Sequence, residues 1–81
     1  MTVRVLLFAA AKEIAGTDHV DVDLPDQATV ADLKRALADQ FPGLRRAMAI
    51  SALAIDRRYT KSNEVLKPEH EVALIPPVSG G

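Results

Sequence analysis

The chain of 81 residues has no cysteine and no tryptophan, and its aromatic residues are one tyrosine and two phenylalanines. Without cysteine it has no means of forming a disulfide, a zinc–thiolate site or a thiol nucleophile. The absence of disulfides is typical of proteins in a reducing compartment, so we expect a cytoplasmic location.

Neither sign of charge predominates, because ten basic and eleven acidic residues give a net charge of −1. The basic residues are scattered, apart from the pairs Arg45-Arg46 and Arg57-Arg58. A nucleic-acid partner would require a basic face whose lysines and arginines displace counterions from the phosphates. We therefore expect no nucleic-acid partner.

Long hydrophobic runs are also missing. The apolar run Val5–Ala11, which follows Arg4, has seven residues and faintly resembles a signal peptide. That length is the lower limit for such a region and is far too short to span a bilayer. Cleavage after the run would also remove an expected strand, so we predict neither a signal peptide nor a membrane partner.

The length is sufficient for one domain and leaves no room for a second core. A domain of this size buries only about 60 to 65 per cent of the surface of its unfolded chain. A deep catalytic pocket is therefore not expected. We place the domain at residues 1–75 and a flexible C-terminal tail at residues 76–81.

Hydrophobic patterning predicts several strands. The segment Thr2–Phe8 is apolar on both faces, with Val3, Val5 and Leu7 as its core set. Aliphatic and acidic residues alternate in His19–Leu24, as in a half-exposed antiparallel strand. Shorter strands are expected at 52–56 and 71–75, and a brief edge strand at 59–63.

One long helix is predicted after Thr29, which is placed to be its N-cap, with Asp32 completing a capping box. A single helical stripe follows, ended by Pro42-Gly43; it consists of Val30, Leu33, Leu37 and Phe41. A short helix is expected at 10–15, capped by Gly16, whereas residues 44–48 fit either a helical turn or a loop.

This order of elements predicts an α+β fold of the β-grasp (ubiquitin-like) type, in which one main helix packs on one face of a mixed sheet. The last strand, Glu71–Ile75, is apolar on both faces, which indicates a central position in the sheet.

No arrangement of residues indicates catalysis. The three serines have no histidine at a recognisable motif spacing, and His19 and His70 form no metal-ligand pattern, so we expect both to be solvated. The acids of the second strand belong to its solvent-facing side and not to a metal loop; they are Asp18, Asp21 and Asp23. We predict no metal site and no bound cofactor.

The informative surface is the sheet face opposite the helix, where Leu6, Phe8, Tyr59 and Ile75 are expected to lie. Contiguous exposed apolar residues mark interfaces, so we expect this face to dock a partner. The alternative is that the segment Ala9–Ala15 folds over it.

The chain ends in Pro76-Pro77-Val78-Ser79-Gly80-Gly81. Glycine has no Cβ and can be threaded through a narrow channel, while the prolines hold the preceding segment extended. These six residues can reach roughly 20 Å at about 3.3 Å per residue. We expect Gly81 to carry a free carboxylate; the alternative is a frayed terminus without a function.

Four stretches carry a resemblance to a known family: Val5–Ala9, Glu13–Thr17, Thr29–Leu33 and Glu71–Gly81. On them, and along essentially its whole length, the chain resembles the small, ubiquitin-like sulfur-carrier subunits of molybdopterin synthase. The ending from Pro76 to Gly81 is the most specific part, because other carriers of this superfamily end in Gly-Gly without the Pro-Pro-Val lead. Since cysteine is absent, a persulfide is excluded and the terminal carboxylate is left as the attachment point for sulfur.

The resemblance implies that an ATP-dependent, ubiquitin-activating-like adenylyltransferase adenylates Gly81, and that a sulfur donor enzyme displaces AMP to leave a thiocarboxylate. The tail then enters the large, catalytic subunit of molybdopterin synthase, where the sulfur attacks a cyclic pyranopterin monophosphate and two deliveries build the dithiolene. The AMP adduct and the sulfur are transient, so no cofactor is held.

In this scheme Gly80 and Gly81 provide reach and reactivity, and the chain is not an enzyme on its own. The residues expected to bind partners are Leu6, Phe8, Tyr59, Ile75, Pro76, Pro77 and Val78. The resemblance also implies that the last strand is parallel to the first.

Three alternatives stay open: another β-grasp sulfur carrier, for thiamine, tRNA thiolation or cysteine synthesis; a ubiquitin-like modifier; and a β-grasp binding module. The chain departs from the family at Glu69-His70, where many relatives have an Asp-Gly turn, and at Asp56, where relatives often have Asn. The first departure leaves the type of that turn open, and the second leaves the role of Asp56 open.

Overall fold

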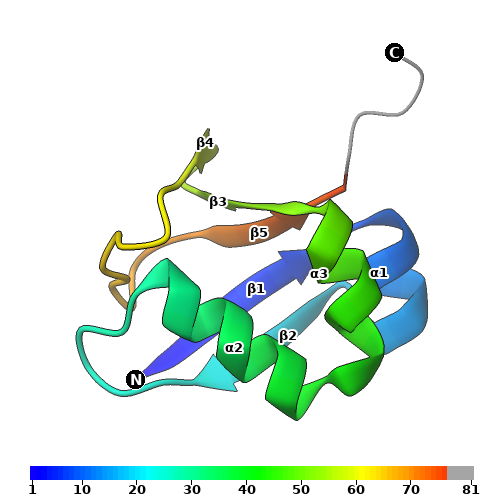
Figure 1. The fold of residues 1–81 in the computed structure, drawn as a ribbon, viewed down its shortest axis with the longest axis horizontal. Coiled ribbons are helices and arrows are strands. Elements are labelled where there is room, and N and C mark those ends of the chain that lie inside the picture. The colour runs from blue at the N-terminus through cyan, green and yellow to red at the C-terminus, as the bar shows by residue number, and fades with distance from the viewer. Residues whose placement is uncertain (77–81) are drawn as a thin grey trace.

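The computed structural model describes residues 1–76 and contains a five-stranded sheet with helices on one face (Figure 1). In chain order the elements are β1 (Thr2–Leu7), α1 (Ala9–Ala15), β2 (His19–Asp23), α2 (Val30–Gln40), the 3-10 turn η1 (Pro42–Leu44), α3 (Arg45–Ile50), β3 (Ala52–Ile55), β4 (Arg58–Tyr59) and β5 (Val72–Ile75).

The strand order is β2-β1-β5-β3-β4. The central strand β5 is parallel to β1 and antiparallel to β3, while β1 and β2 form an antiparallel hairpin. The mixed sheet, the central last strand and its parallel pairing with the first are therefore confirmed. This is the predicted β-grasp arrangement, with α2 lying across one face (Figure 1).

The core lies between this sheet and the helices. On β1, Val3, Val5 and Leu7 are buried as the period of two predicts, and Val72 and Leu74 continue the buried layer on β5. From the helical side the buried residues are Ala11, Val30, Leu33, Leu37, Leu44 and Ala47. Each of these side chains is aliphatic, so the layers are held together by apolar burial.

The capping box of α2 is confirmed. The Asp32 N–H donates to Thr29 Oγ1 at 3.3 Å, and the Thr29 N–H donates to Asp32 Oδ2 at 2.9 Å. The helix ends at Gln40, so Phe41 is its C-cap residue and not the last member of its stripe. Phe41 leaves the helical conformation because it precedes Pro42, and its side chain packs partly buried against the core.

The structure resolves the ambiguous segment 44–48. It forms the end of η1 and most of α3, and its buried residues are Leu44 and Ala47. The predicted short helix is also confirmed as α1, which ends at Gly16 with φ of 74° and an N–H bonded to the Lys12 carbonyl oxygen at 2.9 Å.

The predicted edge strand at 59–63 is wrong in extent, because β4 contains only Arg58 and Tyr59. Beyond it the chain runs along the start of α2, where the Val30 N–H donates to the Glu64 carbonyl at 3.0 Å and the Ala31 N–H to the Ser62 carbonyl at 3.0 Å. The loop therefore supplies acceptors to amides that have no partner inside the helix. It also buries Leu66, which is 2% exposed.

Asp56 lies in the two-residue turn between β3 and β4. Asp56 and Arg57 have φ of 50° and 68°, and Ile55 pairs with Arg58 across the turn. Positive φ at both central residues is the requirement of a type I′ turn, which favours asparagine, aspartate and glycine. The Asp56 N–H donates to the Glu71 carbonyl at 2.8 Å, and Asp56 Oδ1 accepts from the Glu71 N–H at 3.0 Å. Asp56 thus ties the hairpin to the start of β5.

His70 is partly exposed, like His19, and its side chain makes an exposed hydrogen bond. Its N–H donates to the Lys67 carbonyl at 3.0 Å, and its Nδ1 accepts from the Lys67 N–H at 3.1 Å. The side chain therefore closes the turn that precedes β5.

We predict that Thr29→Ala lowers the free energy of unfolding by about 1 kcal/mol, because the Asp32 N–H loses its acceptor. Urea denaturation followed by circular dichroism measures the change. Thr17→Ala is the matched control and should stay within about 0.5 kcal/mol of the unmodified chain. Equal stability of the two variants would contradict the role of the cap.

Asp56→Ala should lower the free energy of unfolding by about 1 to 2 kcal/mol, since the Glu71 N–H loses its acceptor and alanine disfavours positive φ. Asp56→Asn keeps an acceptor and tolerates this conformation, so it should remain within about 0.5 kcal/mol of the unmodified chain. Thermal unfolding of the two variants side by side tests this, and a tolerated alanine would rule out the proposed tie.

Candidate functional site

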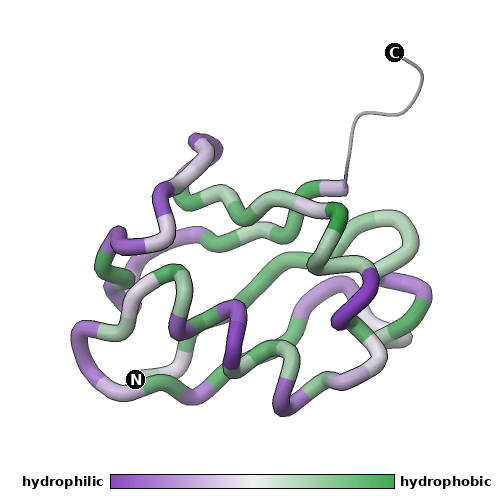
Figure 2. Tube along the Cα trace, in the orientation of Figure 1, coloured by the Kyte–Doolittle hydropathy of each residue, from purple (hydrophilic) through white to green (hydrophobic). Residues whose placement is uncertain are grey.

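The sheet face away from the helices carries one row of residues that crosses all five strands. His19 is paired with Leu6, Leu6 with Ala73, Ala73 with Ala54, and Ala54 with Tyr59. Because neighbours in a row share a face, these side chains form one continuous strip. Figure 2 shows hydrophobic residues along β1, β3 and β5, and hydrophilic ones through the turn between β3 and β4 and the loop after β4.

A groove of about 350 Å³ lies on this face. It is lined by Leu6, Phe8, Ala54, Arg57, Tyr59, Glu71, Ala73 and Ile75. The structure therefore brings the four predicted docking residues of the domain around one groove, and two of them are largely exposed: Phe8 at 45% and Tyr59 at 68%. Their role in docking stays a prediction.

Pro76 follows β5 directly and is half-buried. The other predicted tail residues, Pro77, Val78, Gly80 and Gly81, lie outside the described residues.

The segment Ala9–Ala15 does not cover the groove, so that alternative is wrong. Ala9 has φ of 52°, in the left-handed region, and the chain turns there directly after Phe8. As a result α1 lies beside η1, and Ala11 is buried in the core on the helical side.

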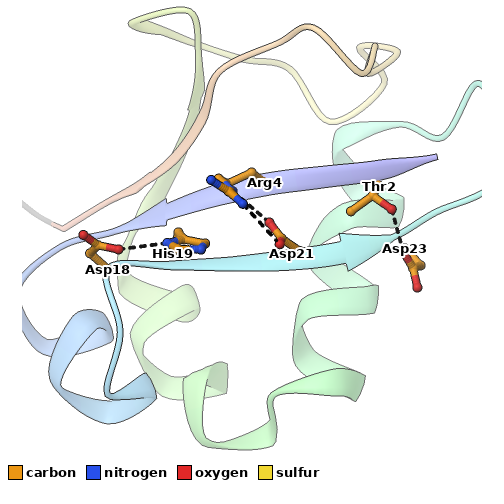
Figure 3. Close-up of polar contacts among 6 residues, drawn as sticks. All are labelled: Thr2, Arg4, Asp18, His19, Asp21 and Asp23. Atoms are coloured by element: carbon orange, nitrogen blue, oxygen red, sulfur yellow. Dashed lines mark hydrogen bonds and ion pairs between the residues drawn. The ribbon is translucent and has the colours of Figure 1, made fainter.

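Beside the apolar strip, the strands β1 and β2 carry polar pairs (Figure 3). Arg4 Nε donates to Asp21 Oδ1 at 3.0 Å and Thr2 Oγ1 donates to Asp23 Oδ1 at 2.8 Å. The Arg4 guanidinium, through its hydrogen bond and charge, lowers the pKa of Asp21. These acids therefore lie on the solvated face of β2, as the alternation of the strand predicted.

His19 is half-exposed and its Nδ1 lies 2.8 Å from Asp18 Oδ1 (Figure 3). The hydrogen bond from this ring lowers the pKa of Asp18. Among residues 1–76 no three histidine, aspartate or glutamate side chains are grouped to hold a metal ion.

In the same residues, no polar or charged side chain is buried, and no helix is long and apolar enough to cross a membrane.

What the described face offers chemically is an apolar groove with charged residues at its rim. Its floor, Ala54 and Ala73, and its rim, Arg57 and Glu71, were missed from the sequence. Period two places Ala73 on the same face as Ile75, and that signal was sufficient to find it.

Comparison with known proteins gives one family and a consistent set of relatives. The model of the ThiS family matches residues 5–81. A molybdopterin synthase sulfur carrier subunit from Dictyostelium discoideum is 38% identical, covering 96% of this chain and 94% of the relative. One from Chlamydomonas reinhardtii is 36% identical and covers 100% of both chains.

The similar solved structures share the fold. The crystal structure of SAMP1 from Haloferax volcanii has a TM-score of 0.85 and 31% identity over 100% of both chains. A putative molybdopterin converting factor subunit 1 from Pyrococcus furiosus has a TM-score of 0.86 and 28% identity, covering 96% of this chain and 99% of that one. A chain of the complex of subunits 1 and 2 of molybdopterin-converting factor from Helicobacter pylori has a TM-score of 0.73 and 26% identity over 100% of both chains.

We expect Arg4→Met to raise the pKa of Asp21, because the guanidinium that lowers it is removed. A group with a lowered folded-state pKa contributes stability above its unfolded pKa and loses that contribution as pH falls through the folded value. Protonation of Asp21 at low pH should therefore lower the free energy of unfolding less in the variant than in the unmodified chain. Carboxyl ¹³C NMR titration measures the pKa, with Lys34→Met as control, and an unchanged Asp21 titration in the Arg4 variant would refute the assignment.

Proposed function

The chain belongs to the ThiS family, and from that premise we propose that it is the sulfur carrier subunit of a molybdopterin synthase. The observation that carries the proposal is the similarity to relatives with that name over 96 to 100% of this chain. The match to the family model also extends to Gly81. The apolar groove beside the end of β5 supports it, because a carrier must dock before its terminus reacts.

The reactive group in this proposal is the C-terminal carboxylate of Gly81. With a pKa near about 3.5 it is ionised at neutral pH and is a poor electrophile. A carboxylate oxygen therefore attacks the α-phosphorus of ATP on an adenylyltransferase, and pyrophosphate leaves. Hydrosulfide supplied by a sulfur donor enzyme then attacks the acyl carbon, AMP leaves with the electron pair of its bond, and loss of the sulfur-bound proton gives a thiocarboxylate on Gly81.

The fold places the groove proposed for docking next to the start of the tail that is proposed to deliver sulfur. Because β5 is parallel to β1, Ile75 and Phe8 lie at the same end of the sheet, and the chain continues from there into Pro76. A partner bound in the groove thus has the start of the tail at its edge. Fixing the start of a short segment limits the space its end explores and raises the effective concentration of the terminus in the partner's active site.

In this proposal the partner that receives the sulfur is the large subunit of the synthase. The complex of subunits 1 and 2 of molybdopterin-converting factor from Helicobacter pylori, which contains a similar chain, supports such a partner. Its active site supplies the acids and bases that transfer sulfur to the cyclic pyranopterin monophosphate. The chain is then a non-catalytic subunit that holds no cofactor or metal and works in the cytoplasm.

The similarity to SAMP1 favours a second candidate function. A closely related structure is described as small archaeal modifier protein 1 from the same organism. In that case the activated Gly81 would be joined to a lysine amine of another protein, and the acyl group would end in an amide instead of a thiocarboxylate.

Incubation with ATP, the adenylyltransferase and a sulfur donor should raise the intact mass by about 16 Da, the exchange of one carboxylate oxygen for sulfur. Tandem mass spectrometry should place the change at Gly81. A variant with one alanine added after Gly81 is the matched control and should show no gain, since its glycine carboxyl is already an amide.

No gain in mass, with an adenylyltransferase shown to act on a known carrier, would refute the sulfur-carrier proposal. Higher-mass conjugates with an isopeptide bond to lysine, formed in place of the thiocarboxylate, would favour the modifier function.

A further inference from the structure

The groove has two alanines at its centre. Ala54 on β3 and Ala73 on β5 are direct cross-strand partners, and the next residues along the row are Tyr59 on one side and Leu6 on the other. Ala54 is only 6% exposed, yet it lies outside the core cluster, because it belongs to the outer face of the sheet. Two adjacent strands of the sheet thus carry the smallest side chain of this row side by side.

Larger side chains surround this pair. Leu6 and Phe8 lie on the β1 side of the alanines and Tyr59 on the β4 side. Ile75 follows Ala73 by two residues on β5, so the small side chains lie among larger apolar ones. Interface energy concentrates in bulky side chains that fill such depressions at the centre of a contact. A flat partner surface would leave this space empty and lose the dispersion contacts of its lining.

We propose that Ala54 and Ala73 are the floor of a socket that receives one bulky apolar side chain of the large synthase subunit, and that their small size determines which side chain fits. The proposal rests on the proposed function, since it takes the large subunit as the occupant. It adds the position and the chemical kind of the central contact.

Two charged residues at the rim of the socket restrict the orientation in which the partner can bind. Arg57 and Glu71 line the groove, and neither forms an ion pair with another residue of 1–76. Arg57 is held by the positive-φ turn, and Glu71 by its two backbone hydrogen bonds with Asp56. The complementary partner therefore presents its apolar side chain beside an acidic group facing Arg57 and a basic group facing Glu71.

Ala73→Leu tests the socket, because the added side chain occupies the depression from an outward-facing, half-buried position. The dissociation constant with the large subunit, measured by isothermal titration calorimetry on the full chain, should rise by about 30-fold or more. The matched control is Ala49→Leu, at an exposed position of α3 on the helical side, and its affinity should be unchanged. Ala73→Ser keeps the floor small and should bind within about threefold of the unmodified chain.

Thermal unfolding of each variant shows whether weaker binding comes from a blocked socket or from an unfolded chain. The serine variant keeps the test valid even where leucine disturbs the sheet. Equal affinity of the unmodified chain and Ala73→Leu would overturn the socket and leave the proposed function intact. Absence of binding by the unmodified chain would overturn both. A dimer of the unmodified chain that Ala73→Leu dissociates, with large-subunit affinity unchanged, would assign the groove to a second copy and overturn this proposal.

Discussion

The parallel pairing of β1 with β5 is the interaction on which the rest of the structure depends. It joins the two ends of the domain, which are separated by almost the whole sequence, and it connects the β1–β2 hairpin to β3 and β4. Without it the sheet would divide into two small pieces, neither of which could cover α2. Closing so long a loop is entropically costly, and the aliphatic core between the sheet and the helices offsets that cost.

On these two strands, one set of alternate residues builds the core and the other set lines the groove. Alternate residues of β1 point to opposite faces, so Val5 and Leu7 build the core while Leu6 and Phe8 line the groove. On β5, Val72 and Leu74 are buried and Ala73 and Ile75 face outward. A change in the outward set should therefore have little effect on the core, so the groove can differ in shape without a change of fold.

Local signals in the sequence were sufficient for much of the fold. The capping box at Thr29, the alternation in β2 and the two-faced hydrophobicity of β5 each depend on residues close together in the chain. Leu66 was missed because it is buried by a loop whose hydrogen bonds go to the distant first turn of α2. No periodicity marks such a segment, since its backbone partners lie far away in the sequence.

The sequence was sufficient to predict the large side chains of the candidate site, whereas its small residues were missed. Phe8 and Tyr59 stand out in a sequence with few aromatic residues, whereas the alanines between them gain meaning only from the register of β3 against β5. The role of Asp56 likewise required the turn geometry and the position of Glu71.

The position of β2 at one edge of the sheet has a consequence for behaviour in concentrated solution. An edge strand offers free backbone donors and acceptors to any extended chain, including an identical one. Here that strand carries Asp21 and Asp23 on its outer face. A second copy aligned along it would bring like carboxylates close together, which disfavours the pairing. The acidic edge therefore disfavours fibril assembly through the sheet of a protein that also exposes an apolar groove.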